Sequence, residues 1–234
     1  MPPLVCGASV RGPAHATLGL PCQDAFAYTR MPDGFTVAVA DGLGSAPRSD
    51  IGAFAATRIA VCHGLRSHEE PSRVAAGAVA RARRALEKQA TRDGCELRDL
   101  ATTLIVVAWR SGRAGIAHIG DGAVVGFGGE RAWMLSPPGA SEYLNEVDPL
   151  TADDWFDHVR VSETLPGLDG VAVFTDGLHH AGLRPDGRPH DGFFAPIVGY
   201  VRDGGDPSEL AVLLEGPKLN EHSDDDKTLV VALA

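Results

Sequence analysis

The chain has 234 residues, of which 44% are hydrophobic and 22% charged, a composition typical of a folded globular protein rather than a disordered one. A net charge of −10 repels phosphate backbones, so nucleic acid is not an expected partner. There is no apolar run of 18 residues, no signal-like N-terminus and no Cys-x-x-Cys pair, so we expect no membrane partner and a cytoplasmic protein with reduced thiols.

The first part of the sequence predicts a β-hairpin with acidic residues at one end. Strands are expected over residues 4–10, 25–28 and 35–40. Residues 11–23 are punctuated by Gly and Pro and are predicted to be loop, and residues 32–34 are a turn. Pairing of the second and third strands would place Asp24 and Asp41 at the same end of two neighbouring strands.

Two helices are expected next, over residues 49–67 and 71–92. In the first, the residues predicted to face inward are Ile51, Phe54, Ala55, Ile59, Cys62 and Leu65. In the second, they are Val74, Ala78, Val79, Ala82 and Leu86. The arginine cluster of the second helix, Arg81, Arg83 and Arg84, is predicted to form a solvated face.

The rest of the chain is mainly β. A four-stranded antiparallel meander is predicted over residues 102–109, 114–119, 123–127 and 131–135. Further strands are expected over 157–165, 169–174 and 228–233, and short helices over 193–202 and 207–214. Residues 136–157 and 179–192 are predicted loops, and the first is long enough to have a functional role. The order of elements predicts an α+β fold in which helices cover the outer faces of stacked antiparallel sheets.

Several aspartates share one setting, the junction between an apolar strand and a loop. They are Asp24, Asp41, Asp176 and Asp225, with Asp121 in a Gly-Asp-Gly turn. A single aspartate in this setting more often forms a turn or a helix cap, so only the occurrence of several together indicates a metal site. Oxygen ligands without cysteine or histidine at ligand spacing favour Mg²⁺ or Mn²⁺ over zinc. Two such ions about 3.5–4 Å apart can share a water and hold a phosphoryl oxygen.

Six short motifs occur in order along nearly the whole chain. They are Gln23-Asp24, Val39-Ala40-Asp41-Gly42-Leu43-Gly44-Ser45, Thr102-Thr103-Leu104, Ile119-Gly120-Asp121-Gly122, Phe174-Thr175-Asp176-Gly177 and Asp225-Asp226-Lys227-Thr228. This set resembles the PP2C (PPM) family of metal-dependent protein phosphatases, and most closely its compact bacterial branch. The resemblance implies one domain over residues 1–234, built as a four-layer α/β/β/α sandwich of two antiparallel sheets flanked by helix pairs.

The resemblance also implies a role for each acidic residue. Asp41 would bridge two ions, and Gly42 would offer its carbonyl oxygen to one of them. Asp176 and Asp225 would hold the other ion, and Asp121 would belong to a third, weaker metal position. Gln23 stands where many relatives have a glutamate ligand, next to Asp24, and its neutral amide is a poorer ligand.

Other departures concern the substrate. The phosphate-binding arginine of relatives corresponds to Gly19, so Arg11, His15 and Arg48 remain alternative phosphate ligands. The histidine that relatives use to protonate the leaving alcohol corresponds to Leu43. His180 falls where relatives often place an aspartate for the third metal.

The expected activity is hydrolysis of phosphoserine or phosphothreonine on proteins by a metal-bridged hydroxide, with Asp41, Asp176 and Asp225 as catalytic residues. The expected partners are a phosphorylated protein and, as a further candidate, a cognate Ser/Thr kinase. The alternatives are a pseudophosphatase that binds phosphoproteins as a regulatory module, and a small-molecule phosphohydrolase.

Overall fold

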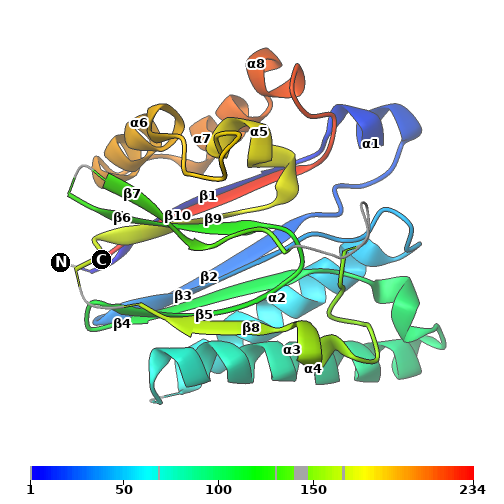
Figure 1. Ribbon diagram of the computed structural model, residues 1–234. Helices are drawn as coiled ribbons and strands as arrows, with labels where there is room; N and C mark the ends of the chain where they lie inside the picture. Colours follow the sequence, from blue (N-terminus) through cyan, green and yellow to red (C-terminus); the bar gives the residue numbers. More distant parts are fainter. Residues whose placement is uncertain (1, 68, 130, 140–146, 165–166) are drawn as a thin grey trace.

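The protein is a stack of two β-sheets with helices on both outer faces (Figure 1). The computed structural model describes residues 2–67, 69–129, 131–139, 147–164 and 167–234. The α+β, four-layer α/β/β/α arrangement expected from the sequence is confirmed.

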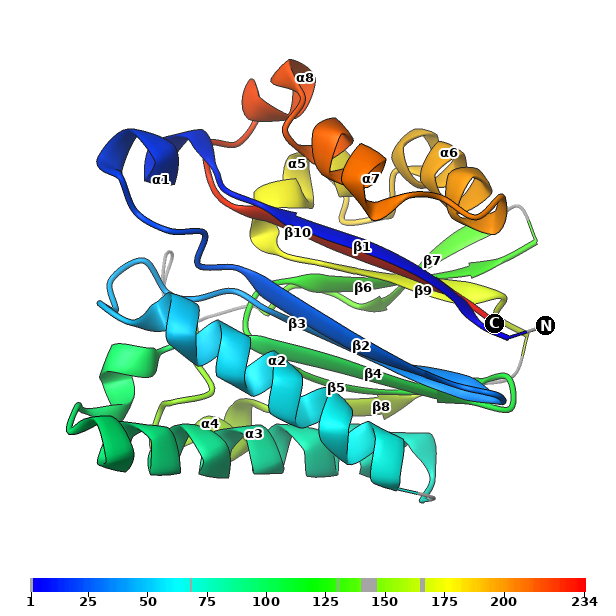
Figure 2. The ribbon, with the colours of Figure 1, turned by 180° about the vertical axis from the view of Figure 1, so that it is seen from behind.

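Both sheets have five described strands and are antiparallel throughout. The first sheet consists, in spatial order, of β1 (Leu4–Val10), β10 (Lys227–Leu233), β9 (Gly170–Phe174), β6 (Ala123–Gly128) and β7 (Arg131–Ser136). The second consists of β2 (Ala25–Met31), β3 (Gly34–Ala40), β4 (Leu104–Arg110), β5 (Arg113–Ile119) and β8 (Arg160–Glu163). The edge strands β1 and β2 lie on the same side of the sandwich (Figure 2).

The long helices form the outer layers. The second sheet is covered by α2 (Ser49–Arg66) and α3 (Pro71–Asp93), and the first by α6 (Asp191–Arg202) and α7 (Pro207–Leu214). The shorter helices are α1 (Pro13–Leu18), α4 (Trp155–His158), α5 (His179–Gly182) and α8 (Pro217–Asn220), with 3-10 turns η1 (Leu97–Leu100) and η2 (Asp176–Leu178). No described helix combines the length and apolar character that a bilayer span needs.

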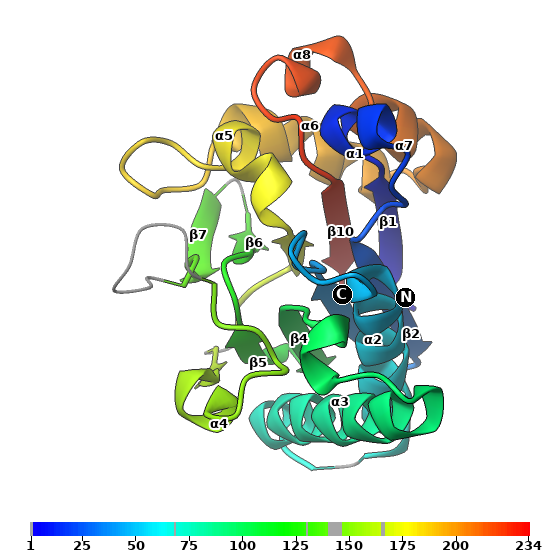
Figure 3. The same ribbon diagram turned by 90° about the vertical axis from the view of Figure 1, so that its right-hand side faces the viewer.

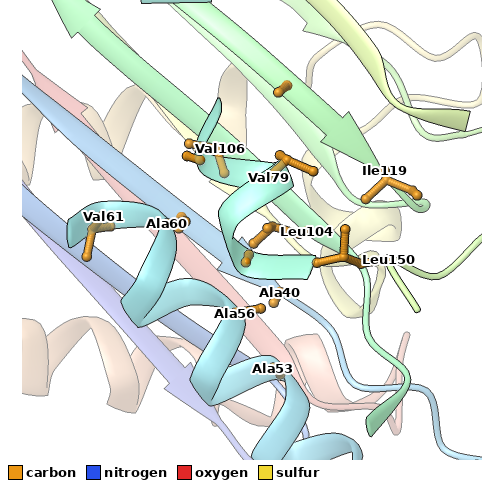
Figure 4. Packing of buried hydrophobic residues seen from close by; sticks show 14 of the residues in the cluster. Ala40, Ala53, Ala56, Ala60, Val61, Val79, Leu104, Val106, Ile119 and Leu150 are labelled. Atoms are coloured by element: carbon orange, nitrogen blue, oxygen red, sulfur yellow. The ribbon is translucent and has the colours of Figure 1, made fainter. Parts of the chain in front are cut away.

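Three apolar clusters fill the three interfaces between the layers. Successive side chains of β3 point to opposite faces of the sheet, so this one strand contributes to two of the clusters. Phe35, Val37 and Val39 belong to the cluster between the sheets, whereas Ala38 and Ala40 belong to the cluster beneath α2 and α3. Figure 4 shows Ala40 within this second cluster. All five side chains are buried, which makes β3 a rigid support for the residue that follows it, Asp41.

The predicted inward face of α2 was wrong. Its fully buried apolar residues are the alanines Ala53, Ala56 and Ala60, whereas Phe54 is 60% and Leu65 52% exposed. Small residues on the helix, among them Ala53 and Ala56, pack beside Ala40 at the end of β3 (Figure 4). The larger side chains of Phe54 and Leu65 are left exposed. The inward face of α3 is confirmed, because every residue predicted to point inward is buried.

The predicted four-stranded meander was also wrong. Strands β4 and β5 pair in one sheet, whereas β6 and β7 pair in the other. The chain crosses between the sheets at Gly120-Asp121-Gly122, where Gly120 adopts a φ of 107°, a value that L side chains rarely adopt. A glycine-rich turn fits both a hairpin and a crossover, so local sequence did not distinguish them.

The predicted loops contain short helices. Residues 11–23 include α1, which is preceded by Gly12 and closed by the left-handed Gly19. Residues 179–192 include all of α5 and the first residues of α6. Residues 136–157 overlap α4, although residues 140–146 of that loop lie outside the described part of the chain. The strand predicted over 157–165 is limited to β8.

Candidate metal centre

A cleft of about 190 Å³ lies at the end of the sandwich where β3 and β9 end and β10 begins. Figure 3 views the layers from this end. The described residues that line it are His15, Gln23, Asp41, Gly42, Leu43, Gly44, Thr103, Asp121, Val147, Asp176 and Asp225. Most of the metal ligands predicted from the sequence are therefore brought together. No arginine or lysine occurs among these lining residues, so the cleft is strongly acidic.

Three carboxylates form the centre of the cleft. Asp41 follows β3, Asp121 lies in the crossover between β5 and β6, and Asp176 follows β9. Each offers an oxygen, and these oxygens all lie within 4.8 Å of one another. The Oδ1 atoms of Asp121 and Asp176 are buried and accept no hydrogen bond from the described residues. Buried carboxylate oxygens that accept no hydrogen bond are available to bind a cation.

The electrostatics of the cluster are unfavourable without a positive charge. Burial, and then the nearby carboxylates beginning with Asp24, raises the pKa of Asp41 well above its usual range. Burial and then Asp176 raise the pKa of Asp121 to about 6. The pKa of Asp225 is raised by burial and then by Asp176. A divalent cation would relieve both the repulsion and the lost hydration.

The donor set fits Mg²⁺ or Mn²⁺. Besides the carboxylates, the cleft contains the buried Oε1 of Gln23, which has no hydrogen-bond donor among the described residues. Gly42 follows Asp41, and a Cβ there would lie 2.8 Å from the carbonyl oxygen of Gln23 and 2.8 Å from atoms of Ser49. Only glycine therefore fits at this position. The three clustered carboxylates and the Gln23 amide offer hard oxygens, and His15 offers a ring nitrogen that lies near Asp225 and Asp226 at the side of the cleft.

The backbone of Asp41 is fixed by its neighbours across the sheet. Its N–H donates to Thr103 Oγ1 at 2.9 Å, and its carbonyl oxygen accepts from Thr103 N at 2.8 Å and from Thr102 Oγ1 at 3.0 Å. Gly42 and Thr102 also form an isolated β-bridge. The central carboxylate is thus held by a rigid scaffold, as an ion site requires.

One functional residue was missed, Asp226, which is only 2% exposed. Its carboxylate accepts from Gly12 N at 2.7 Å and from Gln23 N at 2.5 Å. Its Oδ2 also lies 2.9 Å from His15 Nδ1, although the ring nitrogen is not aligned for a hydrogen bond. Asp226 therefore ties the segment that carries His15 and Gln23 to the start of β10. The available signal was an aspartate placed directly before a buried strand.

Four residues considered from the sequence do not line the cleft. Asp24 is buried behind it, where its Oδ2 accepts from Thr175 Oγ1 at 2.8 Å, and burial raises its pKa well above the usual range. Arg11 is exposed and donates to the carbonyl oxygen of Leu20. Arg48 precedes α2 and forms an ion pair with Asp93 at 2.5 Å. The side chain of His180 is exposed. Of the three phosphate-ligand candidates, only His15 lines the cleft.

The sequence profile of the family described as protein phosphatase 2C matches residues 11–215. The chain belongs to the protein phosphatase 2C family. It is 30% identical to serine/threonine-protein phosphatase 3 of Escherichia coli K12, over 97% of this chain and 96% of that protein.

Solved structures of bacterial serine/threonine phosphatases share the fold. Stp1 from Staphylococcus aureus superposes with a TM-score of 0.68 at 12% identity, over 98% of this chain and 94% of that one. PstP/Ppp from Mycobacterium tuberculosis gives a TM-score of 0.64 at 15% identity, over 100% of this chain and 99% of that one. Of the three positions expected from the sequence to depart from the family motifs, Gln23 and Leu43 line the cleft and Gly19 is exposed at the end of α1.

Proposed function

We propose that this PP2C phosphatase hydrolyses phosphoserine and phosphothreonine on proteins and that it depends on Mg²⁺ or Mn²⁺. The observation that carries the proposal is the convergence of Asp41, Asp121 and Asp176, whose oxygens lie within 4.8 Å of one another in an acidic cleft. The similarity to a phosphatase named for serine and threonine supports the substrate class. A related PstP structure is described as a complex with two manganese ions, which supports a pair of ions here.

We assign the ligands as follows. Asp41 would bridge two ions, Gly42 would add its carbonyl oxygen to one, and Asp176 and Asp225 would hold the other. Asp121 would serve a third, weaker position. Gln23 would act through its amide oxygen, whereas Asp24, which lies behind the cleft, would act indirectly.

When bound, the ions would supply Lewis-acid activation of the attacking water and neutralise charge on the phosphoryl oxygens. The contribution of the chain is to position the carboxylates that would hold the ions. β3 and β9 fix two carboxylates from opposite sheets, so the distance between the ligands depends on the packed core. His15 is the cleft residue that can donate a hydrogen bond from a ring N–H to a phosphoryl oxygen or to the leaving alcohol.

Further proposals concern the setting of the reaction. We propose that residues 1–234 act as one catalytic domain, in the cytoplasm, on targets phosphorylated by a cognate Ser/Thr kinase. All four cysteines are free thiols, which supports a reducing compartment.

The test is phosphate release from a phosphoserine peptide at saturating Mn²⁺, with an EDTA-treated sample as control and calorimetry of peptide binding alongside. We expect turnover that stops in EDTA and returns when Mn²⁺ is added. Peptide binding without turnover would identify the protein as a phosphoprotein-binding pseudophosphatase. Turnover of small phosphate esters alone would identify a small-molecule phosphohydrolase.

A further inference from the structure

Arg83 is the member of the α3 arginine cluster that is not solvated, in contrast to the sequence prediction. Its side chain is buried, with a residue exposure of 7%, whereas Arg81 and Arg84 are exposed. Nη1 donates to the carbonyl oxygen of Leu150 at 2.9 Å and also to that of Ala152. Nε donates to Glu87 Oε1 at 2.8 Å.

These contacts join the outer helix layer to the segment that precedes α4. The guanidinium also lies 6.0 Å from the ring centroid of Trp155, at the start of α4. A buried cation is costly unless its donors are used, and here the donors satisfy two carbonyl groups of a non-repetitive segment. Arg83 is therefore a polar link between α3 and the segment over residues 147–155, in addition to the apolar packing of Leu150 and Trp155.

The same segment reaches the metal centre. Leu150 is fully buried and its N–H donates to the carbonyl oxygen of Thr102 at 2.8 Å. Thr102 in turn contacts the backbone of Asp41 and Gly42. Val147, three residues before Leu150, lines the cleft. A continuous set of contacts thus runs from α3 through Leu150 to both the wall and the floor of the cleft.

We propose that Arg83 is a positioning residue that holds the 147–155 segment so that Val147 forms the substrate-facing wall of the cleft. The inference rests on the proposed phosphatase function. Asp41 has two further hydrogen bonds to Thr103, neither of which involves the 147–155 segment, so we expect the metal-binding floor to depend on Arg83 less than the wall does. Loss of Arg83 consequently acts on substrate binding more than on the chemical step.

The experiment compares Arg83→Met with the matched exposed control Arg84→Met. Methionine keeps an apolar stem but cannot donate to the two carbonyls. For Arg83→Met we expect the KM for a phosphoserine peptide to rise by roughly tenfold, with kcat changed by less than about threefold. Hydrogen exchange at the Leu150 amide should quicken by roughly tenfold. Arg83→Lys, which can still donate to one carbonyl, should recover part of the KM.

The results that would overturn the role of Arg83 differ from those that would overturn the proposed phosphatase function. If wild type releases phosphate but Arg83→Met keeps the KM and the Leu150 exchange rate of Arg84→Met, the inference is overturned. A loss confined to kcat, at unchanged KM, overturns it as well. If wild type releases no phosphate, the proposed function fails, and unchanged exchange at Leu150 in Arg83→Met then overturns the positioning role separately.

Discussion

Asp41 and Asp176 come from different sheets of the sandwich, yet their carboxylate oxygens lie within 4.8 Å of each other. Asp41 follows β3 and Asp176 follows β9, so the two sheets meet at a pair of like charges. Repulsion between these groups opposes the packing of the sheets, and a cation between them replaces it with attraction. Metal binding and the stability of the sandwich should therefore be coupled.

The first prediction concerns Asp176→Asn. Removal of one charge relieves repulsion in the metal-free protein, so its free energy of unfolding should rise by about 1 kcal/mol. The same change removes a proposed ligand, so the increase in Tm on addition of Mn²⁺ should shrink or disappear. Thermal unfolding in EDTA and in Mn²⁺ measures both effects. Asp203→Asn, at an exposed position after α6, is the control and should behave as wild type.

A second prediction follows from Asp121, whose pKa is raised to about 6 by burial and then by Asp176. The folded metal-free protein binds this proton more tightly than the unfolded chain does. Its stability contribution therefore falls as the pH rises from near 3.8 through about 6. Mn²⁺ needs the deprotonated group, so the Tm increase caused by Mn²⁺ should be larger at about pH 7.5 than at about pH 5.5. An equal increase at both pH values would contradict a role for this carboxylate in binding the ion.

A third prediction concerns His118, which is fully buried beside Ser136 and Arg160. Burial and then the positive charge of Arg160 lower its pKa to about 3. The unfolded chain takes up a proton near pH 6.5 that the folded protein does not, so stability is lost as the pH falls from 6.5 towards 3. Urea unfolding should show a slope of up to about 1.4 kcal/mol per pH unit from this group. His118→Gln should have a shallower slope, and an unchanged slope would contradict the assignment.

The layer order was predicted correctly, because it follows from the order of strands and helices along the chain. The acidic motifs that line the cleft could be recognised because each is a local pattern. An apolar strand followed by Asp-Gly can be recognised in the sequence, and the ends of neighbouring strands in antiparallel sheets lie close together. Asp24 shows the limit of this reasoning: it shares the pattern of Asp41 but points behind the cleft, towards Thr175. Strand-end position alone does not specify the direction of a side chain.

The errors arose where tertiary packing outweighs local preference. Phe54 is apolar and Arg83 is charged, yet the first is exposed and the second buried. Because α2 packs close to β3, the helix positions that face the strand hold alanine and the larger side chains lie on the outer face. On α3, carbonyl groups of the distant Leu150 segment compensate a buried guanidinium. Neither partner can be identified from the helical sequence itself.

A fourth prediction addresses Asp226. Its replacement by alanine leaves the buried N–H groups of Gly12 and Gln23 without their acceptor, which should lower the free energy of unfolding by about 1–3 kcal/mol. Because His15 and Gln23 both line the cleft, the KM for a phosphopeptide should rise as well. Asp224→Ala is the control, since the contact of Asp224 to Ala14 uses its backbone carbonyl and survives the substitution. Equal stability and KM in the two variants would contradict the anchoring role.

The central claim is that Asp41 and Asp176 hold the ions that activate hydrolysis. It is tested most directly by phosphate release from a phosphoserine peptide as a function of Mn²⁺, for wild type, Asp41→Asn and Asp176→Asn in parallel. We predict that wild type saturates with Mn²⁺ and that each substitution lowers kcat/KM by at least about a hundredfold. Equal rates for all three proteins at every Mn²⁺ concentration would contradict the claim.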